Sequence, residues 1–175
     1  MSQGLIHIYC GEGKGKTTAA MGLTLRALGN GWRVGIVQFL KGDTTGEISF
    51  LEQLPEVTIS RGKVYDKFSF QMSASELAET RKLHDTLLQQ AVQQALNGQF
   101  DLLVLDESLS ALSSDLLDEH LISSFLANKP ENLEVVLTGR KASEKLLATA
   151  DYVTEMKPIK HPYSRGIPAR RGVEY

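Results

Sequence analysis

A glycine-rich segment near the start of the chain carries the residues with the clearest chemistry. It reads Gly-Glu-Gly-Lys-Gly-Lys-Thr-Thr over residues 11–18. Three glycines within five residues let the backbone turn tightly and approach a ligand closely. The amides of such a loop, with those of a following helix, bind phosphate oxygens, while the lysine reaches the terminal phosphates and the threonine binds Mg²⁺. The predicted nucleotide-binding residues are Gly11, Glu12, Gly13, Lys14, Gly15, Lys16, Thr17 and Thr18.

This segment is a P-loop motif with one departure in its spacing. The usual pattern is G-x-x-x-x-G-K-[ST], and counting back from Gly15 puts Cys10, not a glycine, at its first position. Gly11 therefore starts a loop that is one residue short. The alternative is a glycine-rich turn without a ligand. It is disfavoured because an apolar strand over residues 5–9 precedes the loop and a helix follows it, as the motif requires.

Two acidic residues, Asp106 and Glu107, form the second candidate group. They follow an apolar run over residues 100–105, which is typical of a parallel strand buried on both faces. In P-loop sites one such carboxylate holds Mg²⁺ directly or through water, and the other binds the metal's waters or the loop threonine. The predicted metal ligands are therefore Thr17, Asp106 and Glu107, and the alternative is an acidic helix start.

Three basic residues elsewhere are further candidate nucleotide contacts. Lys41 begins a polar loop after a predicted strand at residues 33–40, and Arg140 follows another at 134–137. Ligands of open α/β sheets bind beyond the carboxyl ends of the strands, so both could contact a phosphate or the ribose. Arg26, within the first predicted helix, is the third. A solvated surface position is the alternative for each.

Residues 61–72 form the least regular stretch of the chain. Its aromatic residues, Tyr65, Phe68 and Phe70, are interleaved with charged ones. Phe68 and Phe70 would share one face of an extended segment, because they lie two residues apart. The stretch is either an edge strand or flap packed on the core, or a lid that presents aromatic rings to a flat ligand.

The elements that must position these residues alternate between strand and helix. Further strands are predicted at residues 57–60 and 152–156. The predicted helices cover residues 16–28, 47–54, 114–128 and 143–150, and the longest follows a Ser73–Glu76 capping box and ends near residue 96. This alternation predicts a P-loop NTPase-like (RecA-like) α/β fold with a mainly parallel β-sheet flanked by helices.

Length and composition limit the remaining possibilities. The 175 residues predict a single domain over 1–175, with a basic tail at 157–175 that is either solvated or packs near the active site over an anionic ligand. A net charge of −2 gives no reason to expect a nucleic-acid partner. One cysteine excludes an intrachain disulfide and fits a reducing compartment. No signal peptide or membrane-length apolar run is evident, so we expect a cytoplasmic protein without a membrane partner.

The chain resembles the P-loop type of ATP:corrinoid adenosyltransferases over essentially its whole length. The one-residue-short loop is itself similar to that of the family. The resemblance rests on residues 11–20, on Val-Gln-Phe-Leu-Lys-Gly at 37–42, on Val-Leu-Asp-Glu at 104–107 and on Thr-Gly-Arg at 138–140. It continues over residues 150–161, which include Thr-Glu-Met-Lys-Pro-Ile-Lys-His, and in the ending at 171–175.

The resemblance implies an unusual use of a P-loop. A Co(I) corrinoid attacks the 5′ carbon of the ribose of ATP, and the whole triphosphate leaves. Lys16, the loop amides and Mg²⁺ would stabilise that leaving group. No protein nucleophile is needed, since cobalt is the nucleophile. The alternatives left open are a P-loop ATPase or small-molecule kinase, and a nucleotide-dependent regulatory module with little turnover.

The resemblance also assigns partners and a role for the aromatic stretch. Phe68 and Phe70 align with a pair that displaces the lower axial ligand of cobalt, although a tryptophan is expected at one of them and Trp32 is the sole tryptophan. Some relatives carry an N-terminal extension before the first strand, and we expect none here, because the predicted first strand already begins at residue 5. The implied substrates are ATP and a cobalamin or cobinamide-type corrinoid, with an electron donor such as a flavodoxin or flavin reductase, and the family is typically homodimeric.

Overall fold

The computed structural model describes residues 3–41, 45–62, 65, 67 and 69–174. Its β-strands form one parallel sheet in the order β3-β2-β4-β5-β1-β6. The strands of this described part are β1 (Ile6–Cys10), β2 (Val34–Gln38), β3 (Val57–Arg61), β4 (Leu102–Asp106), β5 (Glu134–Thr138) and β6 (Tyr152–Glu155).

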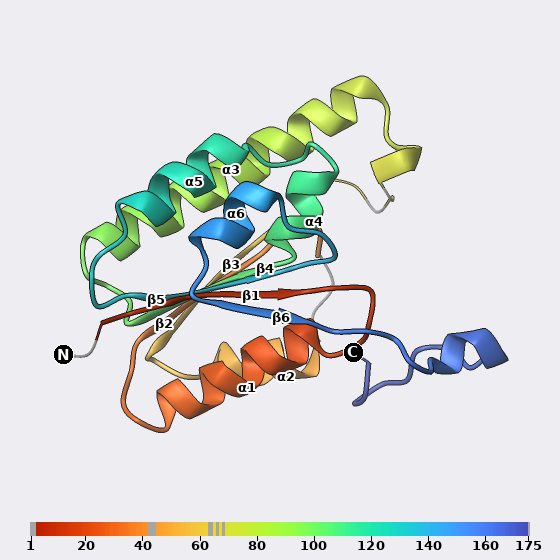
Figure 1. The fold of residues 1–175 in the computed structure, drawn as a ribbon, viewed down its shortest axis with the longest axis horizontal. Helices are drawn as coiled ribbons and strands as arrows, with labels where there is room; N and C mark the ends of the chain where they lie inside the picture. Colours follow the sequence, from red (N-terminus) through yellow and green to blue (C-terminus); the bar gives the residue numbers. More distant parts are fainter. Residues whose placement is uncertain (1–2, 42–44, 63–64, 66, 68, 175) are drawn as a thin grey trace.

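Helices cover both faces of the sheet (Figure 1). One face carries α1 (Lys16–Leu28) and α2 (Gly46–Leu51), and the other carries α3 (Ala74–Leu96), α4 (Ser108–Ser113), α5 (Glu119–Ala127) and α6 (Glu144–Thr149). Two short 3₁₀ helices, η1 (Ser69–Gln71) and η2 (Pro162–Arg165), lie away from the sheet. The architecture confirms the P-loop NTPase-like α/β fold predicted from the alternation of strands and helices.

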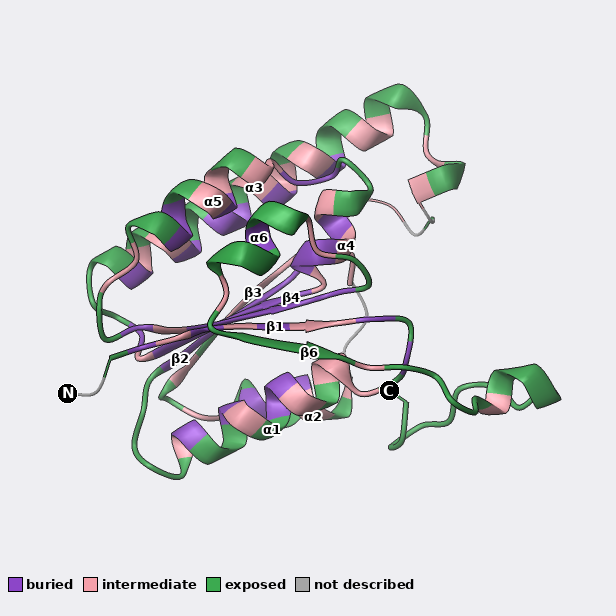
Figure 2. Ribbon diagram, viewed as in Figure 1, coloured by how far each residue is buried: buried purple, intermediate pink, exposed green. Residues whose placement is uncertain are grey.

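The core consists of two apolar layers, one on each face of the sheet. All residues of β2 and β4 are buried, which Figure 2 shows as purple strands between the helices. Side chains alternate between faces along a strand, so Val104 packs in the layer beneath α1 while Leu103 and Leu105 pack in the layer beneath α3 and α5. Asp106 is therefore on the α1 face.

The long helix α3 begins as the sequence predicts. The Ser73 hydroxyl accepts a hydrogen bond from the Glu76 amide, and the Glu76 carboxylate accepts one from the Ser73 amide at 2.7 Å. Each bond satisfies an N–H group that the first turn of the helix leaves without a partner. The capping box is thereby confirmed.

The predicted helix over residues 114–128 is wrong in its N-terminal part. The chain first forms α4, then leaves the helical conformation at Asp115, whose φ is 54°. It begins again at α5, where Asp118 caps the helix by accepting a hydrogen bond from the His120 amide at 2.8 Å. The predicted strand over residues 33–40 likewise ends earlier, at Gln38, because Leu40 adopts a left-handed conformation with φ of 59°.

The segment after β6 runs along the surface and away from the sheet (Figure 1). It is mostly exposed up to Glu174, while Met156 is half-buried against the P-loop. Within the described ranges, α3 and the shorter helices are too polar or too short to cross a membrane.

Candidate functional site

Three polar side chains lie side by side at the carboxyl edge of the sheet. The register of β2 with β4 pairs Gln38 with Asp106, and the register of β4 with β5 brings Thr138 next to Asp106 on its other side. All three are fully buried. Because they share the α1 face, they lie where the P-loop enters α1, which is the edge at which ligands of parallel sheets bind.

Asp106 is the centre of this group. Its Oδ1 accepts hydrogen bonds from the hydroxyls of Thr17 at 2.9 Å and Thr138 at 2.7 Å. Its Oδ2 accepts from Gln38 Nε2 at 3.1 Å and from Lys41 Nζ at 2.7 Å. A buried carboxylate is tolerated only when it is paired and hydrogen-bonded, and these contacts supply both requirements. The predicted metal ligands Thr17 and Asp106 are thus in direct contact.

The conformation of the P-loop depends on its glycines and on hydrogen bonds to the backbone of two other segments. Gly11 and Gly15 have φ of 105° and 120°, which favours glycine. The Gly11 amide donates to the Arg140 carbonyl at 2.9 Å, and the Gly13 amide to the Met156 carbonyl at 2.7 Å. A Cβ atom at Gly13 would lie only 2.7 Å from that Met156 oxygen, so a larger residue would not fit.

Lys16 and the start of α1 provide the cationic part of the loop. Lys16 Nζ donates to the carbonyls of Gly11 at 2.7 Å and Gly13 at 2.8 Å, so its ammonium lies across the loop. No side chain of the described residues caps the N-terminus of α1. The amides of the first turn, with the helix dipole, therefore favour an anion at this point.

Three further basic residues are predicted to contact the nucleotide, and they differ in their position relative to the loop. Arg140 Nη1 is 3.5 Å from Glu12 Oε2, and both side chains are exposed. Lys14 is exposed, and its charge adds a small part to lowering the pKa of Glu174, which is lowered mainly by the hydrogen bond from Arg170. The structure does not bring Arg26 to the loop. It lies in the last turn of α1, about 15 Å from Lys16 at a rise of 1.5 Å per residue.

Glu107 occupies a strained backbone position beside Asp106. Its φ is 59°, which is uncommon for a residue other than glycine. The Glu107 amide donates to Thr138 Oγ1 at 2.9 Å, and the residue stands at the N-cap of α4. Residues other than glycine with a left-handed backbone conformation are frequent at functional sites, where surrounding contacts stabilise that conformation. Thr138 supplies such a contact and links the Glu107 backbone to the Asp106 carboxylate.

The candidate ligands offer hydroxyl and carboxylate oxygens, which are the ligands that Mg²⁺ prefers. The described residues contain no cluster of three or more histidine, cysteine or acidic side chains. Mg²⁺ is usually held by one or two carboxylates together with waters and substrate phosphates, and Thr17, Asp106 and Glu107 match that pattern. Gln38 Oε1 is buried without a hydrogen-bond partner among the described residues, so it offers an acceptor for a water of the ion.

The aromatic stretch ranges from half-buried to exposed where the structure describes it. Phe70 lies in η1 and is 81% exposed, so the interpretation that it packs on the core is wrong. Phe68 lies outside the described residues. Tyr65 donates a hydrogen bond to Glu79, and Lys67 Nζ donates to Glu76 Oε1 at 2.6 Å. These two contacts attach the stretch to the start of α3.

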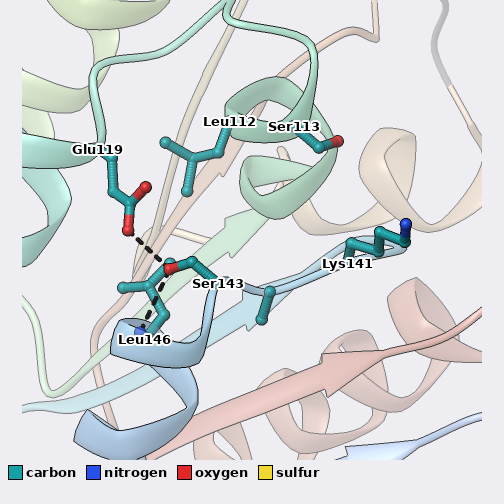
Figure 3. A pocket seen from close by; sticks show the side chains of 7 residues that line it. Leu112, Ser113, Glu119, Lys141, Ser143 and Leu146 are labelled. Atoms are coloured by element: carbon teal, nitrogen blue, oxygen red, sulfur yellow. Dashed lines mark hydrogen bonds between the residues drawn. The ribbon is translucent and has the colours of Figure 1, made fainter.

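A pocket of about 250 Å³ lies between α4, α5 and α6 (Figure 3). Ser143 donates to Glu119 Oε1 at 2.6 Å at its wall, and Lys141 lies at its rim. Its lining includes none of the P-loop residues, although Lys141 directly follows Arg140. The pocket is therefore a neighbour of the nucleotide site, not part of it.

Sequence reasoning missed Gln38 and Thr138 as members of the site. Each is the last residue of a buried strand, and a polar residue at that position was the available signal. It also missed Met156, whose backbone contacts both Gly11 and Gly13. These residues do not belong to the loop motif, and they reach it only through the order of the strands.

Comparisons with known proteins match nearly the whole chain to one family. The model of the family described as ATP:corrinoid adenosyltransferase BtuR/CobO/CobP matches residues 2–175. The chain is 34% identical over 176 residues to the corrinoid adenosyltransferase of Escherichia coli K12, covering 99% of this chain and 86% of that protein. It is 35% identical over 181 residues to the corrinoid adenosyltransferase CobA of Salmonella typhimurium, with coverage of 99% and 86%. Among solved structures, the flagellar accessory protein FlaH of Methanocaldococcus jannaschii superposes with a TM-score of 0.57 at 15% identity, covering 89% of this chain and 72% of that one, which is a likeness of fold alone.

Proposed function

Because the chain belongs to the ATP:corrinoid adenosyltransferase family, we propose that its P-loop site holds ATP with the 5′ carbon of the ribose facing a Co(I) corrinoid. The function of the family is the ATP-dependent adenosylation of corrinoids. Cobalt supplies both electrons of the new cobalt–carbon bond. The bond between the 5′ carbon and its oxygen breaks, and that electron pair leaves with the triphosphate.

Stabilising the departing triphosphate is the main task of the protein in this reaction. The observation that carries the proposal is the convergence of Lys16, Thr17 and Lys41 where α1 begins. Lys16 would exchange the carbonyls of Gly11 and Gly13 for phosphate oxygens, and the first-turn amides of α1 would donate to others. Preorganised donors of this kind lower a barrier because they need little rearrangement as charge develops, and removing one costs about 10²–10³ in kcat.

Magnesium belongs to the proposal through Thr17, Asp106 and Glu107. A bound Mg²⁺ would supply positive charge to the triphosphate oxygens. Thr138 and Gln38 hold the Asp106 carboxylate in place for this role.

A protein nucleophile is not required, and the cysteine next to the loop is poorly suited to be one. Burial, with the nearby Glu155, raises the pKa of the Cys10 thiol, while Lys16 acts weakly in the opposite direction. A raised pKa leaves less thiolate, which is the reactive form.

Family membership disfavours the alternatives of an ATPase or a small-molecule kinase.

The corrinoid would approach the aromatic stretch at the exposed Phe70. Phe70 presents its ring to the surface in η1, and the proposal assigns to Phe68 and Phe70 the displacement of the lower axial ligand of cobalt. The contacts of Tyr65 and Lys67 with α3 support this role, since a tethered loop holds aromatic rings in a defined position.

The remaining parts of the proposal concern partners and location. Co(I) must be generated by reduction, so we include an electron donor such as a flavodoxin or flavin reductase and a cytoplasmic location. A homodimer is included because the edge strand β6 exposes Tyr152 and Val153, and exposed edges invite pairing. The tail over residues 157–175 would lie near the nucleotide, which is supported by the small effect of the Lys14 charge in lowering the pKa of Glu174.

The proposal is tested by incubating the protein with ATP, Mg²⁺ and chemically reduced cobalamin. We expect the absorption spectrum of an alkylated corrinoid to develop, and Lys16→Ala to abolish it. Lys145→Gln, which removes an exposed lysine of α6, is the control and should leave the rate unchanged. Absence of the alkylated product, or an equal rate for Lys16→Ala, would overturn the proposal.

A further inference from the structure

Lys41 lies between the two groups that a divalent cation would need. Its Nζ is 2.7 Å from Asp106 Oδ2 and 3.2 Å from Thr17 Oγ1, and its side chain is 27% exposed. A magnesium ion binds its oxygen ligands at about 2.0–2.1 Å. An ammonium group already in contact with both oxygens leaves no room for an ion bound to both.

We propose that Lys41 competes with the divalent cation for Thr17 and Asp106, and that it leaves them only when a triphosphate offers its ammonium group another acceptor. Divalent metal would then bind to this chain together with the nucleotide and not before it. The inference rests on the proposed function, because that function assigns the metal to Thr17 and Asp106.

The backbone at Leu40, just before Lys41, is fixed by a contact with α3, and this sets the position of the Lys41 Cα atom. Leu40 has φ of 59°, an uncommon conformation for a bulky residue. Its amide donates to Nε2 of His84 at 3.4 Å, and Nδ1 of His84 donates to the Leu116 carbonyl at 2.9 Å. His84 is fully buried on α3 and packs edge-on against Phe39 at 5.4 Å between ring centroids.

The buried charge of Asp106 determines whether Lys41 or the divalent cation occupies the site. Asp106 is fully buried, and an uncompensated buried carboxylate is strongly unfavourable. One cation must therefore stay beside it, and Lys41 is tethered there by the chain. A triphosphate changes the balance, because its oxygens accept from Lys41 while its bound metal compensates Asp106.

The test measures metal binding without nucleotide or corrinoid. Mn²⁺, a spectroscopic substitute for Mg²⁺, is titrated into the full chain by electron paramagnetic resonance, and melting temperature is recorded in parallel. The wild type should bind Mn²⁺ no more tightly than Lys145→Gln, the control that loses the same charge from an exposed site. Lys41→Gln should bind at least about tenfold more tightly. Its melting temperature should rise by about 5–10 °C when Mn²⁺ reaches a hundred times the dissociation constant.

Further variants locate the gained site. Adding Asp106→Asn to Lys41→Gln should abolish the gain, because it removes the carboxylate charge. Lys41→Met keeps the aliphatic stem and replaces Lys41→Gln if the latter does not fold. Three results would each overturn the inference. They are tight Mn²⁺ binding by the wild type without nucleotide, no gain in Mn²⁺ affinity when the ammonium is removed, and a gain in affinity that survives Asp106→Asn. None of these measurements depends on adenosylation, so a failure here is distinguishable from a failure of the proposed function.

Discussion

Thr138→Val is the substitution that most sharply tests how the site is held. The Thr138 hydroxyl donates to Asp106 Oδ1 at 2.7 Å and accepts from the Glu107 amide at 2.9 Å. Valine has nearly the same shape, so the strand and its packing should persist while both hydrogen bonds are lost. The residue is fully buried, and no water replaces the hydroxyl at low cost.

The magnitude follows from the two bonds. A hydrogen bond to a charged group contributes about 1.5–3 kcal/mol, and leaving a buried donor unsatisfied costs about 1–3 kcal/mol. The added methyl group regains roughly 0.8 kcal/mol through burial. We therefore expect a loss of about 3 kcal/mol in the free energy of unfolding, which lowers the melting temperature by about 6–12 °C for a chain of this size.

Urea unfolding followed by circular dichroism measures this change. Thr154→Val is the matched control, since Thr154 lies on the edge strand β6, is exposed, and should change stability by less than about 0.5 kcal/mol. Thr138→Val should also require more Mg²⁺ for half-maximal activity, because Asp106 and Glu107 lose their common support. A loss below about 1 kcal/mol, or one equal to that of Thr154→Val, would refute the reasoning.

Four further substitutions probe individual roles. Lys16→Ala should abolish turnover and weaken ATP binding measured by calorimetry, since it removes the cation at the leaving phosphates; near-normal turnover would contradict the P-loop assignment. Glu107→Gln should raise the Mg²⁺ requirement without lowering the melting temperature, and an unchanged Mg²⁺ titration would assign the metal to other residues. Phe70→Ala should leave folding and ATP binding intact, because the ring is exposed, and should slow turnover with a weak reductant far more than with a strong one; equal losses would exclude a role in cobalt reduction. Burial lowers the pKa of His84, so the unfolded chain binds more protons than the folded one below the ordinary histidine pKa of about 6.5, and stability should fall as pH falls through that value. His84→Gln should remove this part of the pH dependence in urea titrations at pH 7 and pH 5, and an identical slope for both proteins would show that other groups cause it.

The parts of the site that sequence predicts are those formed by contiguous residues. The loop at residues 11–18 and the pair Asp106–Glu107 each follow an apolar strand, so local pattern and motif identify both. The same holds for the parallel sheet and for the capping box of α3. Each of these features can be recognised from residue types within a contiguous segment or from the order of such segments.

The parts that sequence does not predict depend on which strands are neighbours. Gln38 and Thr138 join Asp106 only because β2 and β5 flank β4, and strand order is not visible in local pattern. Arg26 lies at the opposite end of α1 from the loop. Periodicity predicts the helix but does not show at which of its ends a ligand binds. Asp115 interrupts the predicted helix through a left-handed conformation that its residue type does not demand.

The exposure of Phe70 shows a third limit. An aromatic residue in an irregular segment is compatible with a packed flap and with a lid, and composition does not distinguish them. The structure decides against packing because Phe70 is 81% exposed and η1 stands away from the core, while Lys67, just before η1, is bonded to Glu76 at the start of α3.

The central claim is that ATP is cleaved at the 5′ carbon and not between phosphates. The most direct test is phosphorus magnetic resonance of a reaction containing ATP, Mg²⁺ and reduced cobalamin, with the cobalt–carbon product counted by absorption in the same sample. The account predicts intact triphosphate, released in a one-to-one ratio with the cobalt–carbon bond formed, and no release without corrinoid. Formation of ADP and free phosphate in proportion to turnover would contradict it.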